Sequence, residues 1–148
     1  MPRPQTALLF HSATPGLARR GLRAFAKRLE SEVAAGRKFH CLIADNGEVR
    51  RLNRDFRKQD YATDVLSFPA EGAAGFLGDI AISFEQARQQ AAEYGHTVGQ
   101  EIEILMLHGL LHLLGMDHET DRGRMERAEN KWRAALGLPR GLIERVRA

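Results

Sequence analysis

Three histidines that lie close together carry the clearest chemical signal in this sequence. His108, His112 and His118 are half of its six histidines and fall within one segment of 11 residues. Since His108 and His112 are four residues apart, a helix places them one above the other on the same face. Gly115 can adopt a left-handed conformation at low cost, so the helix can end there and the chain can bring His118 back. The spacing therefore predicts a metal site held by three imidazoles.

Three neutral imidazoles leave one tetrahedral position of a zinc ion open to water, which is typical of catalytic rather than structural zinc sites. Zinc lowers the pKa of such a water to about 7 and polarises an acyl or phosphoryl oxygen. We expect one Zn²⁺ per chain, although imidazoles also accept other divalent first-row metals. Cys41 is the only cysteine, which excludes a cysteine-rich zinc site. The alternative is that the histidines are ordinary buried residues of an apolar helix, where unpaired imidazoles would be costly.

The residue after the first histidine distinguishes this helix from that of the zincin proteases. Those enzymes carry a glutamate at this position, and the glutamate is the general base of peptide hydrolysis. The present sequence has Gly109 there. The helix is therefore zincin-like in the spacing of its ligands but lacks the base that a peptidase needs.

Composition and charge indicate one folded domain. The 148 residues are 43% hydrophobic and 28% charged, and no apolar run reaches the roughly 18 residues of a membrane span. The N-terminus lacks the apolar core of a secretory signal, so we expect a cytoplasmic protein. Residues 1–60 carry a net charge of +7 and residues 61–148 a net charge of −4. This asymmetry suggests a polyanionic partner, with a solvated arginine-rich surface as the alternative.

The spacing of apolar residues predicts the elements that must position the histidines. Thr14 is expected to cap a first helix ending at Gly36, Asn46-Gly47 to form a turn, and Phe56 to point inward. Strands and helices do not alternate strictly, which predicts an α+β fold: a small mixed sheet of about four strands packed with about five helices, as a single metal-dependent hydrolase domain over residues 1–148. Strands are expected at 5–10, 39–43, 65–69 and 79–83, and the other helices at 48–56, 84–94, 98–114 and 122–136.

Several ordered motifs resemble those of the bacterial YbeY proteins, a family of metal-dependent endoribonucleases of ribosomal RNA maturation. The family's signature, His-Gly-x-Leu-His-Leu-x-Gly-x-Asp-His, is met in full from His108 to His118. Two further family blocks resemble residues 53–69, with Asn-Arg-Asp-Phe-Arg and Thr-Asp-Val-Leu-Ser-Phe-Pro, and residues 77–82, with Leu-Gly-Asp-Ile-Ala-Ile.

The resemblance implies a mixed sheet flanked by helices, a three-histidine zinc site and an important arginine, which falls on Arg57. It also implies single-strand-specific cleavage of RNA in 16S ribosomal RNA 3′ end maturation and in ribosome quality control. The implied partners are ribosomal RNA on the small subunit and ribosomal or ribosome-associated proteins. The oligomeric state stays open.

Cleavage of a phosphodiester needs positive charge where negative charge develops on the phosphate oxygens. Arg57 has a planar fork suited to such oxygens and is the candidate catalytic residue, provided that its loop folds over the histidines. The alternative is a surface arginine after a short helix. Arg54 and Lys58 are the candidate substrate-binding residues, through contacts with the RNA backbone. Three carboxylates are candidates for orienting a histidine through its second ring nitrogen: Asp64, Asp79 and Asp117. The alternative for Asp64 and Asp79 is that they cap a turn or a helix.

Two functions other than RNA hydrolysis stay open on the sequence alone. The first is a ribosome-assembly factor that binds RNA or protein and uses zinc only for structure, with Asp117 or Glu119 closing the fourth ligand position. The second is a metallopeptidase-like hydrolase, against which the missing glutamate argues. Zinc retained without metal-dependent turnover would favour the first alternative, and cleavage of peptides the second.

Overall fold

The structure, a computed structural model, describes residues 5–61, 63–71, 75–117 and 120–139. Four strands and five helices lie within these residues, which confirms the predicted α+β class. In chain order they are β1 (Ala7–Phe10), α1 (Arg19–Glu32), β2 (Lys38–Ala44), α2 (Asn46–Arg57), β3 (Val65–Pro69), β4 (Phe76–Ser83), α3 (Phe84–Tyr94), α4 (Val98–Leu113) and α5 (Arg124–Leu136).

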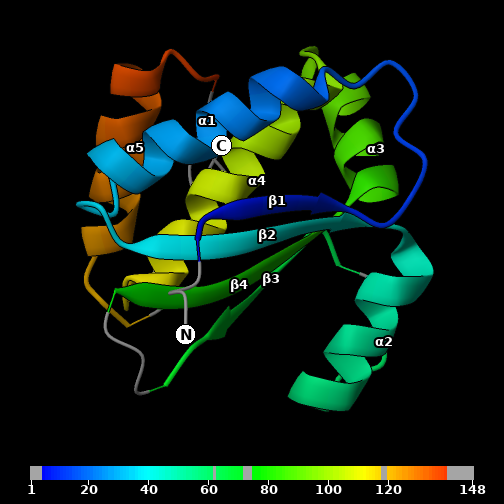
Figure 1. Cartoon of the computed structure of the whole chain (residues 1–148), viewed down its shortest axis with the longest axis horizontal. Coiled ribbons are helices and arrows are strands. Elements are labelled where there is room, and N and C mark those ends of the chain that lie inside the picture. The colour runs from blue at the N-terminus through cyan, green and yellow to red at the C-terminus, as the bar shows by residue number, and fades with distance from the viewer. Residues whose placement is uncertain (1–4, 62, 72–74, 118–119, 140–148) are drawn as a thin grey trace.

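The strands form one mixed sheet in the order β1-β2-β4-β3. The first three strands in this order are parallel, and β3 runs antiparallel to β4 at one edge. Phe39, Cys41 and Ile43 of β2 are fully buried on one face of the sheet, whereas His40 and Leu42 between them are only half-buried. Burial raises the pKa of the Cys41 thiol, so this cysteine is a core residue rather than a nucleophile. Figure 1 shows α1, α3, α4 and α5 gathered on one side of the sheet and α2 apart from them.

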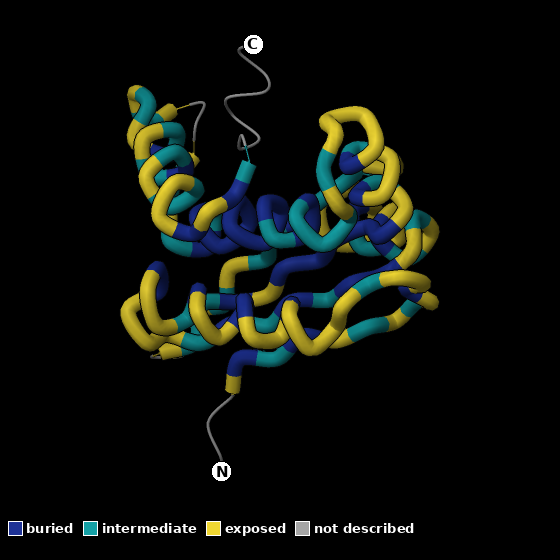
Figure 2. Tube along the Cα trace, turned by 90° about the horizontal axis from the view of Figure 1, so that it is seen from above, coloured by how far each residue is buried: buried dark blue, intermediate teal, exposed yellow. Residues whose placement is uncertain are grey.

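Helix α4 is the central element of the core. It is in contact with β3, β4 and three other helices, and Figure 2 shows it as a buried segment surrounded by more exposed ones. Thr97 and Gln100 form a capping box at its start. At its end Gly115 has a φ of 90° and its N–H donates to the carbonyl of His112, so the predicted left-handed turn is confirmed. Among the described residues no helix is long and apolar enough to span a membrane.

Three local predictions are wrong. Thr14 does not cap a helix, because α1 begins at Arg19, whose Nε instead donates to the Thr14 hydroxyl at 2.9 Å. Asn46-Gly47 is not a separate turn but the first turn of α2, because Asp45 caps this helix with its side chain. Phe56 is 69% exposed rather than buried, although its ring lies edge-on to that of Phe68 with the centroids 5.8 Å apart.

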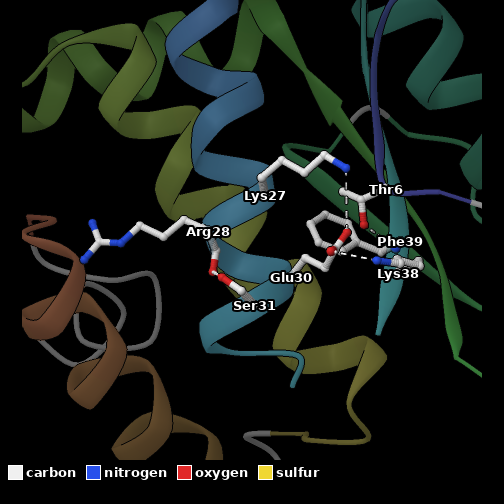
Figure 3. Close-up of polar contacts among 7 residues, drawn as sticks. All are labelled: Thr6, Lys27, Arg28, Glu30, Ser31, Lys38 and Phe39. Carbon is white, nitrogen blue, oxygen red and sulfur yellow. Dashed lines mark hydrogen bonds and ion pairs between the residues drawn. The ribbon is translucent and has the colours of Figure 1, made fainter. Parts of the chain in front are cut away.

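A cluster of polar side chains around Glu30 joins α1 to the sheet (Figure 3). Lys38 at the start of β2 donates from Nζ to Glu30 at 2.8 Å, and Lys27 lies one turn before Glu30 on α1. The Thr6 hydroxyl beside them accepts the N–H of Phe39 at 3.3 Å. Burial raises the pKa of the Glu30 carboxyl, but hydrogen bonds from Lys38 and Thr6 and the charges of Lys38 and Lys27 outweigh it and hold the pKa below its ordinary value of 4.5.

We expect Glu30→Gln to lower the free energy of unfolding at pH 7 by about 1 kcal/mol, because the charge that Lys38 binds is lost. A carboxyl whose pKa is lowered by folding contributes stability above its unfolded pKa and loses this contribution as the pH falls through its folded pKa. The difference from the parent protein should therefore be largest above pH 4.5 and shrink below it. Urea unfolding at several pH values measures this difference.

Glu32→Gln is the matched control, since Glu32 lies on the same helix in an exposed ion pair with Arg28. It should cost little at any of these pH values. A deficit of Glu30→Gln that stays constant as the pH falls to 3 would contradict a lowered pKa.

Candidate active site

A cleft of about 500 Å³ lies beside α4 and collects three segments that are far apart in the sequence. The histidine helix supplies one wall, the end of α2 with the loop behind it supplies another, and β3 supplies the third. Its lining residues are Asn53, Arg57, Gln59, Tyr61, Thr63, Asp64, Val65, Leu66, Ser67, Pro69, His108, His112 and Asp117. The two predicted histidines that the structure describes therefore share one cleft with the predicted arginine.

The imidazoles of His108 and His112 are adjacent on α4. Their ring centroids lie 4.8 Å apart with the rings nearly perpendicular, and His108 is 8% exposed. His118, the third predicted ligand, and Glu119 lie outside the described residues. Within the described residues there is no group of three or more His, Cys, Asp or Glu that could hold a metal. The two rings nevertheless offer a donor pair of the kind that zinc and related metals bind.

Gly109 faces the sheet rather than the cleft. A Cβ atom at this position would lie 2.8 Å from Cγ2 of Ile80, a buried residue of β4. The Ser67 hydroxyl of β3 donates to the carbonyl of Gly109 at 3.0 Å, which holds the helix against the sheet. A side chain here would therefore push into the core, and this explains why the position of the zincin glutamate holds no catalytic group in this fold.

The arginines of α2 differ in their ionic partners. Three of the four pair with carboxylates one to ten residues away: Arg50 with Asp60 at 2.8 Å, Arg51 with Glu48 at 3.5 Å and Arg54 with Asp55 at 3.3 Å. Arg57 is the fourth, and within the described part of the chain it has no such partner. It is also the one that lines the cleft. Its positive charge is thus available to an anion that enters beside the histidines.

Asn53 holds the loop that follows Arg57. This residue is 1% exposed, and its side-chain Nδ2 donates to the carbonyl of Tyr61 at 3.0 Å. Its own carbonyl accepts the N–H of Gln59 at 3.2 Å and caps α2. Lys58 adopts a left-handed conformation with a φ of 60° at this helix end. Neither Lys58 nor Arg54 is among the described residues that line the cleft.

The three carboxylates suggested by the sequence take different positions. Asp117 lines the cleft, and so does Asp64, whose side chain accepts the N–H of Val65 at 2.8 Å at the start of β3. Asp79 lies with His40 in a separate, mainly apolar hollow, and its Oδ1 is 3.4 Å from Nδ1 of His40. Asp79 is therefore not placed to orient either described histidine of the cleft.

Sequence reasoning missed Glu129, a carboxylate that does contact a histidine of the pair. Its Oε2 lies 2.8 Å from Nδ1 of His108, and the residue is 1% exposed. A signal was present in the sequence, because Met125 and Leu136 lie on the same apolar stripe of α5 and a glutamate interrupts that stripe. Only the packing of α5 against α4 shows which side chain this glutamate meets.

These features define a class of α+β protein. In this class a helix packs against a mixed sheet, and two histidines of the helix line a cleft together with an arginine. Comparison with known proteins identifies the family. The chain belongs to the endoribonuclease YbeY family, whose model matches residues 11–137. The resemblance expected from the motifs is confirmed.

The chain is similar to two bacterial proteins over most of its length. A protein of Solibacter usitatus named endoribonuclease YbeY is 60% identical over 143 residues, which cover 97% of this chain and 96% of that protein. A protein of the same name from Koribacter versatilis is 46% identical over 131 residues, covering 88% and 86%. The solution structure of TM1509 from Thermotoga maritima matches with a TM-score of 0.60 over 86% of each chain. At 23% identity this last likeness shows the fold alone.

We expect Gly109→Ala to lower the melting temperature. The added methyl group would overlap a branched side chain of the core, and such overpacking costs about 1–3 kcal/mol. This cost outweighs the roughly 1 kcal/mol that alanine gains over glycine inside a helix. Thermal unfolding followed by circular dichroism measures the change.

The matched control is Gly21→Ala on α1, where the new methyl group would meet no atom within 4 Å. This variant should keep or slightly raise the melting temperature. If Gly109→Ala is as stable as the parent protein, α4 does not approach the sheet as closely as described.

Proposed function

We propose that the protein is a zinc-dependent endoribonuclease that cleaves single-stranded RNA and acts in the cytoplasm on ribosomal RNA, in 16S 3′ end maturation and ribosome quality control. One observation carries the proposal: His108, His112 and an arginine without an ionic partner in the described chain line the same cleft. Membership of the endoribonuclease YbeY family supports RNA as the substrate. The proposed partners are the small ribosomal subunit and proteins associated with it.

His108 and His112, together with His118, are the proposed zinc ligands. The support is the chemistry of the donors, because two imidazoles four residues apart on one helix stand side by side at the cleft. When bound there, zinc would supply a Lewis acid and activate water for hydrolysis at neutral pH.

Arg57 is the proposed catalytic arginine. Its guanidinium can donate two parallel hydrogen bonds to phosphate oxygens, and no ion pair within the described chain has to break first. Asn53 supports this role, since it holds the loop that follows the arginine. Arg54 and Lys58 are exposed and close to Arg57 in the sequence. They are proposed to guide the RNA backbone outside the cleft.

Metal analysis combined with an RNA cleavage assay tests the proposal. We expect the parent protein to bind one zinc per chain and to cut single-stranded RNA. His112→Ala should bind less than one equivalent and cut none, because one of the described imidazoles at the cleft is removed. Circular dichroism of the variant checks that α4 still forms.

Two other results would count against the proposed function. Zinc at one equivalent without cleavage of free RNA or of RNA in ribosomal subunits would favour an assembly factor with a structural metal. Cleavage that persists in a zinc-free variant would contradict the site, because the activity would then not depend on these histidines.

Arg57→Ala should slow RNA cleavage by about 10²–10³-fold, because a group that stabilises developing negative charge is removed. The bound zinc should stay near one equivalent, since this residue is not a proposed ligand. Arg57→Lys should recover part of the rate, because it keeps the charge but not the planar fork. Single-turnover cleavage rates measure both effects.

Arg20→Ala provides the control for charge alone, since Arg20 is exposed on α1 and does not line the cleft. It should cut RNA at nearly the parent rate. Loss of zinc together with activity in Arg57→Ala would refute a separate role for the arginine.

A further inference from the structure

The buried stripe of α5 contains a carboxylate where an apolar side chain would serve packing better. Met125 and Leu136 are buried on this stripe, and Glu129 between them is 1% exposed. Figure 1 shows α5 beside α4, and the two helices are in contact. Replacing a buried charged pair by apolar groups of similar volume is often neutral or stabilising. Packing alone therefore does not account for a glutamate here.

The contact between Glu129 and His108 indicates which ring nitrogen of His108 carries the hydrogen. An ionised carboxylate only accepts hydrogen bonds, so the 2.8 Å contact between its Oε2 and Nδ1 of His108 requires the hydrogen to be on Nδ1. In a neutral imidazole the other nitrogen, Nε2, then carries the lone pair. His108 lines the cleft, so this lone pair belongs to a residue of the proposed site.

The same contact constrains the ring itself. Buried hydrogen bonds that involve a charged group are stronger than neutral ones, and Glu129 is held in place on α5. The ring of His112 packs edge-on against that of His108, with centroids 4.8 Å apart. An orientation imposed on His108 therefore limits the positions open to His112 as well.

We propose that Glu129 is a positioning residue that fixes His108 in its Nδ1–H tautomer and leaves Nε2 to act at the cleft. The tautomer is inferred from the contact of a neutral imidazole with an ionised carboxylate, whereas its effect on zinc binding and RNA cleavage rests on the proposed function. Carboxylates that accept the second ring N–H of a metal-binding histidine typically contribute about 10–100-fold to metal affinity or activity.

The protein contains a matched pair outside the cleft. Glu101 on α4 is fully buried, and its Oε1 lies 2.5 Å from Nε2 of His96. Its other oxygen accepts the side-chain N–H of Gln90 at 2.8 Å. Neither Glu101 nor His96 lines the cleft. Glu101→Gln thus removes the charge from a buried carboxylate–histidine contact of the same kind without touching the proposed site, and it matches Glu129→Gln.

Long-range ¹H–¹⁵N NMR of the metal-free protein tests the tautomer, since it distinguishes Nδ1–H from Nε2–H imidazoles. We expect Nδ1–H at His108 in the parent protein, in Glu129→Gln, whose amide oxygen still accepts the hydrogen, and in Glu101→Gln. In Glu129→Leu the acceptor is gone, and a measurable Nε2–H population should appear. An Nε2–H tautomer in the parent protein, or unchanged Nδ1–H in a folded Glu129→Leu, would overturn the proposal.

Zinc affinity, measured by competition with a chelator, provides the second readout. Glu129→Leu should bind zinc about 10–100-fold more weakly, and Glu129→Gln several-fold more weakly because the charge is lost. Glu101→Gln should bind zinc like the parent protein even if its melting temperature falls. If Glu129→Leu does not fold, the tautomer of the parent protein and the affinity of Glu129→Gln decide. Equal weakening in Glu101→Gln would show that the effect is general destabilisation.

The two proposals fail in different ways. If the parent protein cuts no RNA but His108 is Nδ1–H and depends on Glu129, the positioning role stands and the proposed function fails. If zinc-dependent cleavage is normal and the His108 tautomer does not respond to Glu129, the proposed function stands and the positioning role fails.

Discussion

The close approach of α4 to the sheet is the constraint on which the rest of the structure depends. Gly109 permits this approach, because any side chain at its position would collide with Ile80. The hydroxyl of Ser67 holds the same point of the helix through its carbonyl. His108 and His112 lie on either side of this contact in the sequence, so it determines how deeply both imidazoles stand in the cleft. A glycine in mid-helix costs helix propensity, and here that cost is offset by packing and by the position of the site.

Around α4, a few buried polar groups fix the relative orientation of neighbouring segments, because hydrogen bonds are directional and apolar contacts are not. Glu129, Glu101 and Asn53 are each buried to 1% exposure or less and each makes a hydrogen bond. Burial of such groups is costly unless they are paired, so each pair allows few arrangements of the segments that it joins. They tie α5 to α4, the end of α3 to the start of α4, and the loop after Arg57 to α2. The apolar core supplies most of the stability, and these contacts orient the segments next to the cleft.

The arginines of α2 show how the positive charge of the first part of the chain is distributed. The first 60 residues have a net charge of +7, yet three of the four arginines of α2 pair with a carboxylate one to ten residues away. Arg57 stands apart because the helix ends there and its side chain reaches the cleft. The net charge thus suggests a polyanionic partner but not where it binds. The position of Arg57 in the cleft indicates where an anion would meet the histidines.

Local patterns in the sequence were sufficient for the fold class, the left-handed turn at Gly115 and the shared face of His108 and His112, because each depends on residues within a few positions of one another. They were misleading at Thr14, because α1 begins only at Arg19, and at Asn46-Gly47, which is the first turn of α2. These local patterns could not predict contacts between segments that are far apart in the sequence. The meeting of Arg57 with the histidines, the place of Asp79 on another surface and the contact of Glu129 with His108 arise when helices and strands pack, since their partners are separated by 21 residues or more.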